Sequence, residues 1–244
     1  MTDKLRINLE EIAAGIRSDI FRVEEALNLV RLIGAHASNI NEGGFGIFFG
    51  RLQLILQEQI ILLISKVYEN PKEYPLRSIP EVEKLLQENK ASFISIESAD
   101  ETVFALLERL GCERSSTRGK SVTELFPKYW QNHFGSTKLA RRKIDTLRNK
   151  ASAHHEQVDA SSLPEISYNE IRRLLEQAKL FIAFVETTYL EFAVVDYTAH
   201  DYLPTEESKT ASLVMNNLLV KANIINRQKA REVVKTLFYK SSAG

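Results

Sequence analysis

The stretch SYNEIRRLLEQAKLFIAFVETTY, residues 167–189, decides the fold class of this 244-residue chain. Ser167, with Glu170 three positions later, forms a capping-box pattern, in which the two side chains satisfy free backbone amides at a helix start. The apolar residues that follow recur every three or four positions and predict one buried helical stripe: Ile171, Leu174, Ala178, Ile182, Val185 and Tyr189. This helix could reach Tyr197.

The same apolar spacing continues on both sides of this helix. A first helix is expected to start at Asn8 and to end between Ser38 and Asn41, and a segment around Pro127 and Trp130 is expected to be irregular. Further helices are expected over residues 46–68, 78–90, 100–110, 137–151, 206–221 and 226–239. The helix at 46–68 is apolar almost all the way round, so we expect it to be the central one.

No alternating run is long enough to predict a β-sheet. The fold class is therefore all-α, an antiparallel helical bundle with extra C-terminal helices. The best candidate boundary lies between residues 199 and 206. We expect a helical bundle at 1–200 and, at 201–244, a basic helical hairpin packed on or beside it.

The formal net charge is zero, but the charge is segregated along the chain. Residues 113–150 carry ten Lys or Arg against three carboxylates, and residues 221–240 carry six against one. Such segments could steer a polyanion to one face, or they could be ordinary solvated helix faces. No run approaches the roughly 20 apolar residues of a membrane span, and the start is polar, so we expect a cytoplasmic protein without a membrane partner.

The sequence LRNKASAHHE, residues 147–156, places a permanent cation, an amide and an imidazole within two helical turns. On an unbroken helix His154 would lie about 120° from Arg148, whereas His155 would be nearly in line with it. These residues could take part in catalysis, but two purely structural roles are also open. Asp145 could pair with Arg148 or Arg141, and the histidines could compensate the dipole at a helix end.

Arg148-Asn149, followed after four residues by His154, resembles the motif of the HEPN superfamily, which is set in an all-α bundle. The pattern Arg-Asn-Lys-x-x-Ala-His, preceded by Trp130 and Phe134, is similar to the branch associated with bacterial abortive infection. The resemblance covers residues 137–156 well and 45–195 loosely.

The resemblance implies a metal-independent endoribonuclease, a toxin or defence effector, that forms a homodimer with a composite active site. A histidine can take the proton of a ribose 2′-hydroxyl, and arginine can stabilise the charge that builds on phosphorus. The products would carry 2′,3′-cyclic phosphate and 5′-hydroxyl ends. Arg148, His154 and Asn149 would be catalytic. The residues that hold RNA would be Lys138, Arg141, Arg142 and Lys150.

The active histidine, the mode of control and the activity itself each have an alternative. His155 fits a one-residue-longer spacing, although the alanine before His154 favours His154. Glu156 occupies the position of a tyrosine that a partner nucleotidyltransferase modifies in one HEPN branch, so we do not expect that control. A noncatalytic HEPN module that binds RNA, nucleotide or protein is an alternative. A helical adaptor, with Arg148 buried against Asp145, is another.

Metal and cofactor sites are not expected. His36, His133 and His200 are isolated from one another and from paired carboxylates, which argues against a metal centre. The glycines at 43–50 are not followed by the Lys-Ser/Thr of a phosphate-binding loop. The expected partners are therefore RNA and a second copy of the chain, and they could include an antitoxin or another defence-system protein.

Overall fold

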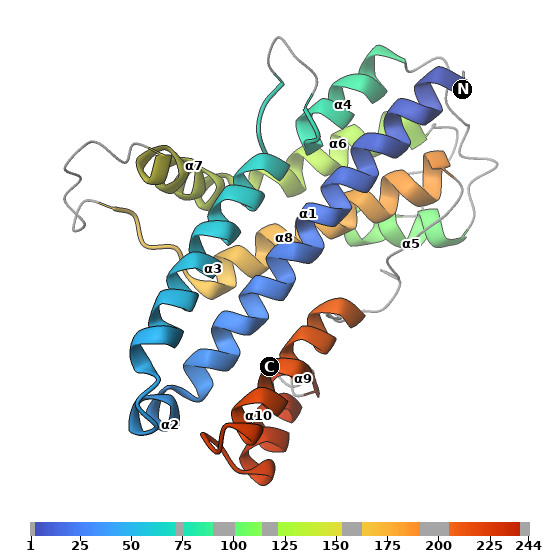
Figure 1. Cartoon of the computed structure of the whole chain (residues 1–244). Helices are drawn as coiled ribbons and strands as arrows, with labels where there is room; N and C mark the ends of the chain where they lie inside the picture. The colour runs from blue at the N-terminus through green and yellow to red at the C-terminus, as the bar shows by residue number, and fades with distance from the viewer. Residues whose placement is uncertain are drawn as a thin grey trace. The chain divides into compact units, whose positions relative to one another are not determined.

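The structure is a computed structural model that describes residues 3–71, 76–89, 101–113, 122–152, 163–190 and 205–239. Every regular element within these ranges is helical, which confirms the all-α fold class (Figure 1). The elements are α1 (Asp3–Ala35), α2 (Ala37–Glu42), α3 (Gly46–Val67), α4 (Ile79–Glu88), α5 (Glu101–Arg109), α6 (Val122–Gly135), α7 (Lys138–Ser152), α8 (Tyr168–Val185), the π-helical turn η5 (Glu186–Leu190), α9 (Glu206–Lys221) and α10 (Arg227–Tyr239).

The chain divides into two compact units. The first contains Met1–Ile20 and Ile64–His200, and the second contains Phe21–Leu63 and Asp201–Gly244. Residues 21–63 thus group with the C-terminal helices in one unit. The predicted domain division at residues 200 and 201 stays a prediction.

Helix α8 forms the core of the first unit. It begins at the predicted capping box, where Ser167 and Glu170 satisfy each other's backbone amides. Every residue from Gln177 to Val185 is buried, and the helix lies against α5 and α7. The apolar stripe predicted for this stretch is buried along its whole length, so local capping and periodicity gave the correct element here.

Helix α6 contradicts the prediction of an irregular segment around Pro127. Proline inside a helix removes one backbone hydrogen bond and costs about 3 kcal/mol. Aromatic packing offsets that cost: Phe126 stacks on Phe184 with ring centroids 3.8 Å apart, and Trp130 lies 4.8 Å from Phe181. Burial of a large apolar side chain stabilises the folded state by roughly 1.5–3 kcal/mol for each residue.

The start of the first expected helix differs from the prediction. α1 begins at Asp3 instead of Asn8, because Leu5 and Leu9 extend the same buried stripe by one more turn. α8 continues into the π-helical turn η5 at Glu186–Leu190, and the expected extension to Tyr197 lies outside the described residues. The fully buried Glu186 carboxylate pairs there with Arg17 of α1, so the turn places a charge where a partner is available.

The second unit holds the hairpin of α9 and α10, which lie side by side (Figure 1). α9 starts at the residue predicted, Glu206, and Thr205 caps it through the backbone amide of Ser208. Polar contacts join α9 to the N-cap residue of α2, His36, and join the N-cap residue of α9, Thr205, to α1. His36 Nε2 lies 3.1 Å from Asn216 Oδ1, and the backbone amide of Thr205 donates to Glu24 at 2.7 Å.

Helix α3 has the predicted bounds but not the predicted burial. Leu56, Ile60 and Val67 are buried. The opposite side is open: large apolar side chains on it are from 48% to 80% exposed, namely Ile47, Phe48, Leu54, Ile55 and Leu62. The expectation that α3 is the central helix was therefore wrong, because its neighbours cover only one of its faces.

Candidate functional site

The predicted site residues Arg148, Asn149 and Lys150 lie in the last turns of α7. Ala140 and Ile144 bury one face of α7, and this leaves Arg148 at the edge of that face with 27% of its side chain exposed. The side chain of Lys150, and both His154 and His155, lie outside the described residues. The structure thus describes the arginine and amide part of the motif.

Arg148 is held by two acceptors. Its Nη1 lies 3.4 Å from Oε1 of Glu69, and its Nε and Nη2 each donate to Asn149 Oδ1 at 3.3 Å. The ion pair is therefore with Glu69 and not with Asp145, and the side chain is not buried. Both features differ from those that the helical-adaptor alternative requires. A carboxylate and an amide oxygen placed in this way fix the plane of the guanidinium and direct its remaining donors.

A buried polar network fixes the elements that carry this pair. Gln177 of α8 donates to the carbonyl of His133 at 2.7 Å and accepts from Thr137 Oγ1 at 2.6 Å, which anchors the turn between α6 and α7. Tyr68 Oη donates to the Leu174 carbonyl at 2.6 Å, and so anchors the residue that precedes Glu69. Unmade bonds in such a buried network cost about 1–3 kcal/mol each. Arg148 and Glu69 are thus both positioned from α8.

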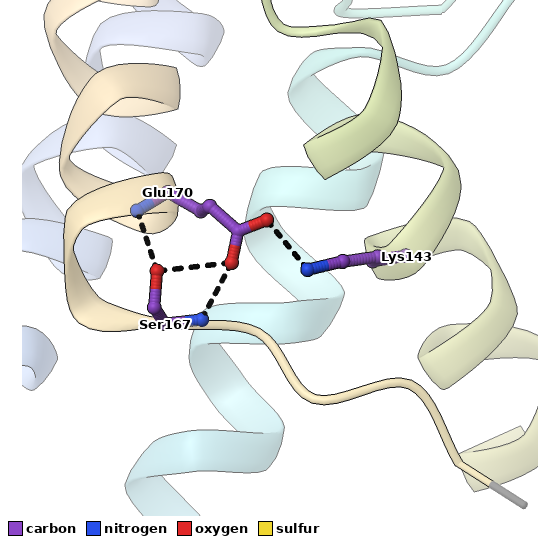
Figure 2. A network of polar contacts seen from close by, with 3 residues as sticks. All are labelled: Lys143, Ser167 and Glu170. Atoms are coloured by element: carbon purple, nitrogen blue, oxygen red, sulfur yellow. Dashed lines mark hydrogen bonds and ion pairs between the residues drawn. The ribbon is translucent and has the colours of Figure 1, made fainter.

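A second contact between α7 and α8 lies at the capping box (Figure 2). Lys143 Nζ is 2.6 Å from Glu170 Oε1, while Glu170 Oε2 accepts from the amide of Ser167 at 2.8 Å. Lys143, followed by the Ser167 amide, lowers the pKa of Glu170 to about 2. The residue that caps α8 therefore also ties down the middle of α7.

The four residues predicted to hold RNA are placed differently from one another. Lys138 and Arg142 are exposed on α7. Arg141 instead turns inward: its guanidinium lies 3.4 Å from the centre of the Phe134 ring, and Nη2 donates to the Phe134 carbonyl at 2.8 Å. Burial lowers the pKa of Arg141. RNA binding by these side chains stays a prediction, and the contacts of Arg141 give it a packing role.

Two acidic residues near this region were missed by the sequence analysis. Glu69 meets Arg148, and Glu83 of α4 accepts from Gln131 Nε2 at 2.8 Å. Burial raises the pKa of Glu83 to about 7, against the opposing charge of Arg141. Neither acid belongs to a motif or to a regular spacing. Each contacts its partner only in the tertiary fold, so the sequence carried no signal for these two contacts. Perturbed carboxyls of this kind gather at functional sites, although structural networks produce them as well.

Within the arrangement of Arg148, Asn149 and Glu69, only the Arg148 guanidinium can bind an anion, and the other two side chains orient it. A guanidinium that is partly exposed and already oriented can offer paired donors to phosphate oxygens. Within the part of the chain that the structure describes, no group of three or more His, Cys, Asp or Glu side chains could hold a metal ion. Phosphate binding by Arg148 at the end of α7 stays a prediction.

Comparison with known proteins agrees with the fold class and with the resemblance to HEPN proteins. The family model of AbiU2, a HEPN family, matches residues 4–203. No curated protein and no solved structure matches the chain significantly. The family match covers most of the chain and includes α7 with Arg148 and Asn149. The chain therefore belongs to the AbiU2 family of HEPN proteins, the branch associated with abortive infection.

Proposed function

We propose that this protein is a HEPN-type endoribonuclease that cleaves RNA without a metal ion. The observation that carries the proposal is the state of Arg148: in a chain of the AbiU2 family, the motif arginine is partly exposed and oriented by Glu69 and Asn149. A structural arginine would be turned into the fold, as Arg141 is against the ring and the carbonyl of Phe134. Arg148 keeps an exposed side that can receive a phosphate.

The proposed reaction follows from these residue types. A histidine of the motif removes the proton of a ribose 2′-hydroxyl, whose oxygen attacks the adjacent phosphorus. The bond to the 5′-oxygen breaks, and a second imidazole protonates that leaving group. Arg148 stabilises the negative charge on the phosphoryl oxygens while Asn149 keeps the guanidinium in place. The products are a 2′,3′-cyclic phosphate and a 5′-hydroxyl.

A homodimer would supply both imidazoles, one from each motif. His154 is the proposed base and acid, with His155 as the alternative. Lys138 and Arg142, which are exposed on α7, would contact the RNA backbone. In the cell the activity would serve as a toxin or defence effector in the cytoplasm, held in check by an antitoxin or another defence-system protein.

The proposal is tested by incubating the purified protein with total RNA in the presence of a chelator and by assaying for 2′,3′-cyclic phosphate ends. Removal of one group that stabilises the transition state typically costs 100- to 1,000-fold in rate. We expect Arg148→Ala to lose at least 100-fold, and one of His154→Ala and His155→Ala to do the same. Arg173→Ala is the matched control, since Arg173 is an exposed arginine on α8, and it should keep full activity.

Circular dichroism must show that each variant is folded. Full cleavage by Arg148→Ala, or by both histidine variants, would overturn the mechanism. RNA binding by the unmodified protein without new cyclic phosphate ends would instead assign the chain to the noncatalytic HEPN alternative.

A further inference from the structure

The exposed face of α3 carries more apolar surface than a free helix face normally does. Five large side chains lie on it, with exposures from 48% at Leu62 to 80% at Ile47. They follow one stripe, because residues seven positions apart lie two helical turns apart on the same side of a helix. Ile47 and Leu54 have this spacing, and so do Phe48, Ile55 and Leu62. Contiguous exposed apolar patches of this type mark interaction sites, whereas scattered single residues do not.

Two opposite charges lie within this stripe. Arg51 and Glu58 are exposed and are also seven residues apart. Side chains on a helix contact those three or four positions away. Within the stripe, the residues at these distances from Arg51 and from Glu58 are all apolar, so neither charge can form an ion pair within α3. Among the described residues, no ion pair or side-chain hydrogen bond involves Arg51 or Glu58. The stripe thus presents one cation and one anion without partners.

The order of these residues is symmetric about a point between Leu54 and Ile55. If a second α3 is laid antiparallel across a two-fold axis at that point, position i faces position 109 − i, as the sequence numbers require. Arg51 then faces Glu58 of the second copy, and the reverse contact forms at the same time. The apolar residues match as well, with Ile47 opposite Leu62. A parallel pair would instead place Arg51 against Arg51.

We propose that the exposed face of α3, residues 47–62, is a docking surface for a second copy of the chain in this antiparallel register. Such a contact is isologous, because the same patch serves both copies. It buries the apolar rows and supplies each unpaired charge with a partner, which removes the cost of an uncompensated charge at an apolar interface. The inference rests on the exposure and the charge order of α3 and not on the ribonuclease chemistry. A protein that self-associates through α3 but does not cleave RNA would therefore count against the proposed function only, whereas a monomeric protein would count against both.

A membrane is the competing occupant. α3 is long and apolar enough to cross a bilayer by length and composition, with a mean hydropathy of 1.6 over 18 residues, of which 22% are buried in the fold. A bilayer would leave Arg51 and Glu58 unpaired in hydrocarbon, at a cost of about 2.5–3.5 kcal/mol for an arginine near the centre. A second copy of α3 satisfies both charges, and charge complementarity therefore favours self-association.

Charge reversal followed by charge exchange tests the register. In sedimentation equilibrium at micromolar concentration, R51E and E58R should each place like charges opposite one another and at least halve the mass of the assembly. The double variant R51E/E58R restores opposite charges and should recover the mass of the unmodified protein. R173E, which reverses an exposed arginine on α8, is the matched control and should not change the mass.

Circular dichroism spectra of all four variants should be unchanged, because the substituted side chains are exposed. A monomeric unmodified protein, unchanged mass in both single variants, or no recovery in the double variant would each overturn the proposed surface. Flotation of the unmodified protein with phosphatidylcholine vesicles would assign the face to a lipid surface and would also overturn it. If the unmodified protein does not cleave RNA but all variants have the expected assembly masses, the result would count against the proposed function only.

Discussion

Helices α8 and α3 are both long and rich in large apolar residues, but only α8 is covered. From Gln177 to Val185 every residue of α8 is buried, and neighbours reach it from several directions. α3 buries residues such as Leu56 and Ile60 while its opposite face remains open. The two helices also differ in where their charged side chains lie. α8 buries its own Lys179, whereas α3 keeps Arg51 and Glu58 exposed inside the apolar stripe.

This contrast shows that apolar content alone does not determine how a helix is used. A helix that is covered on all sides has to place each polar group against a partner in its own chain. Gln177 meets this condition through Tyr68 and Thr137. The exposed charges of α3 do not, and the open face is therefore suited to a partner from outside the fold.

The largest expected effect comes from breaking the covered helix. Phe181→Ala removes a fully buried ring that packs against Trp130 and Phe126. We expect the free energy of unfolding to fall by about 3–5 kcal/mol, from lost burial and the cavity left behind. Urea denaturation followed by circular dichroism measures the loss. A loss below about 1 kcal/mol would mean that α8 is not the core helix of its unit.

The next effect concerns the partly buried carboxyl of Glu83 and depends on pH. Its folded pKa is raised by burial from 4.5 to about 7, so between these values the folded state binds more protons than the unfolded state. Stability from this group is fully present below pH 4.5 and is lost as the pH rises through 7. After a discount for partial exposure, the loss is about 2 kcal/mol.

Glu83→Gln should remove this decline, because the amide does not ionise and keeps the shape of the side chain. The measurement compares the free energy of unfolding at pH 5 and pH 8 in the variant and in the unmodified protein. An equal decline in both proteins would assign the pH dependence to other groups.

A smaller effect tests how α8 is started. Ser167→Ala removes the acceptor for the Glu170 amide and one donor to the Glu170 carboxylate, both seen in Figure 2. Loss of an N-cap side chain costs about 1 kcal/mol. Ser167→Asn, which can still cap, serves as the control and should recover most of the stability. Equal losses in the two variants would show that the cap does not stabilise α8.

The smallest effect is expected on the open face. Leu54→Ser, made in the R51E background so that self-association does not contribute, should change the free energy of unfolding by less than about 0.5 kcal/mol, as is usual for exposed positions. Urea denaturation at low micromolar concentration checks this value. A loss above about 2 kcal/mol would show that Leu54 is covered within its own chain, and the comparison of α3 with α8 would then fail.

Much of the fold could be predicted because it depends on local interactions. The capping box at Ser167 and the start of α9 at Glu206 are confirmed, since a cap and an apolar period involve residues within one or two turns of each other. The segment around Pro127 was predicted wrongly. Proline disfavours a helix locally, but ring packing between α6 and α8 outweighs it.

The candidate site divides in the same way. Arg148 and Asn149 could be identified from the sequence, because they are adjacent in a motif. Glu69 and Glu83 could not, because each contact crosses a sequence separation of tens of residues. The inward turn of Arg141 was also hidden, since its two aromatic neighbours come from separate elements.

The sequence by itself determined that the chain is helical, where most of the helices lie and which motif it carries, because caps, periodicity and motif spacing are interactions between near neighbours. Only the tertiary structure decided which faces are covered, which acid holds Arg148 and which arginine is withdrawn into the fold. The physical reason is that burial and electrostatic environment depend on what lies across from a residue in space. α3 shows this most directly, since its pattern is apolar almost all the way round and predicted a central helix, whereas one face of it is open.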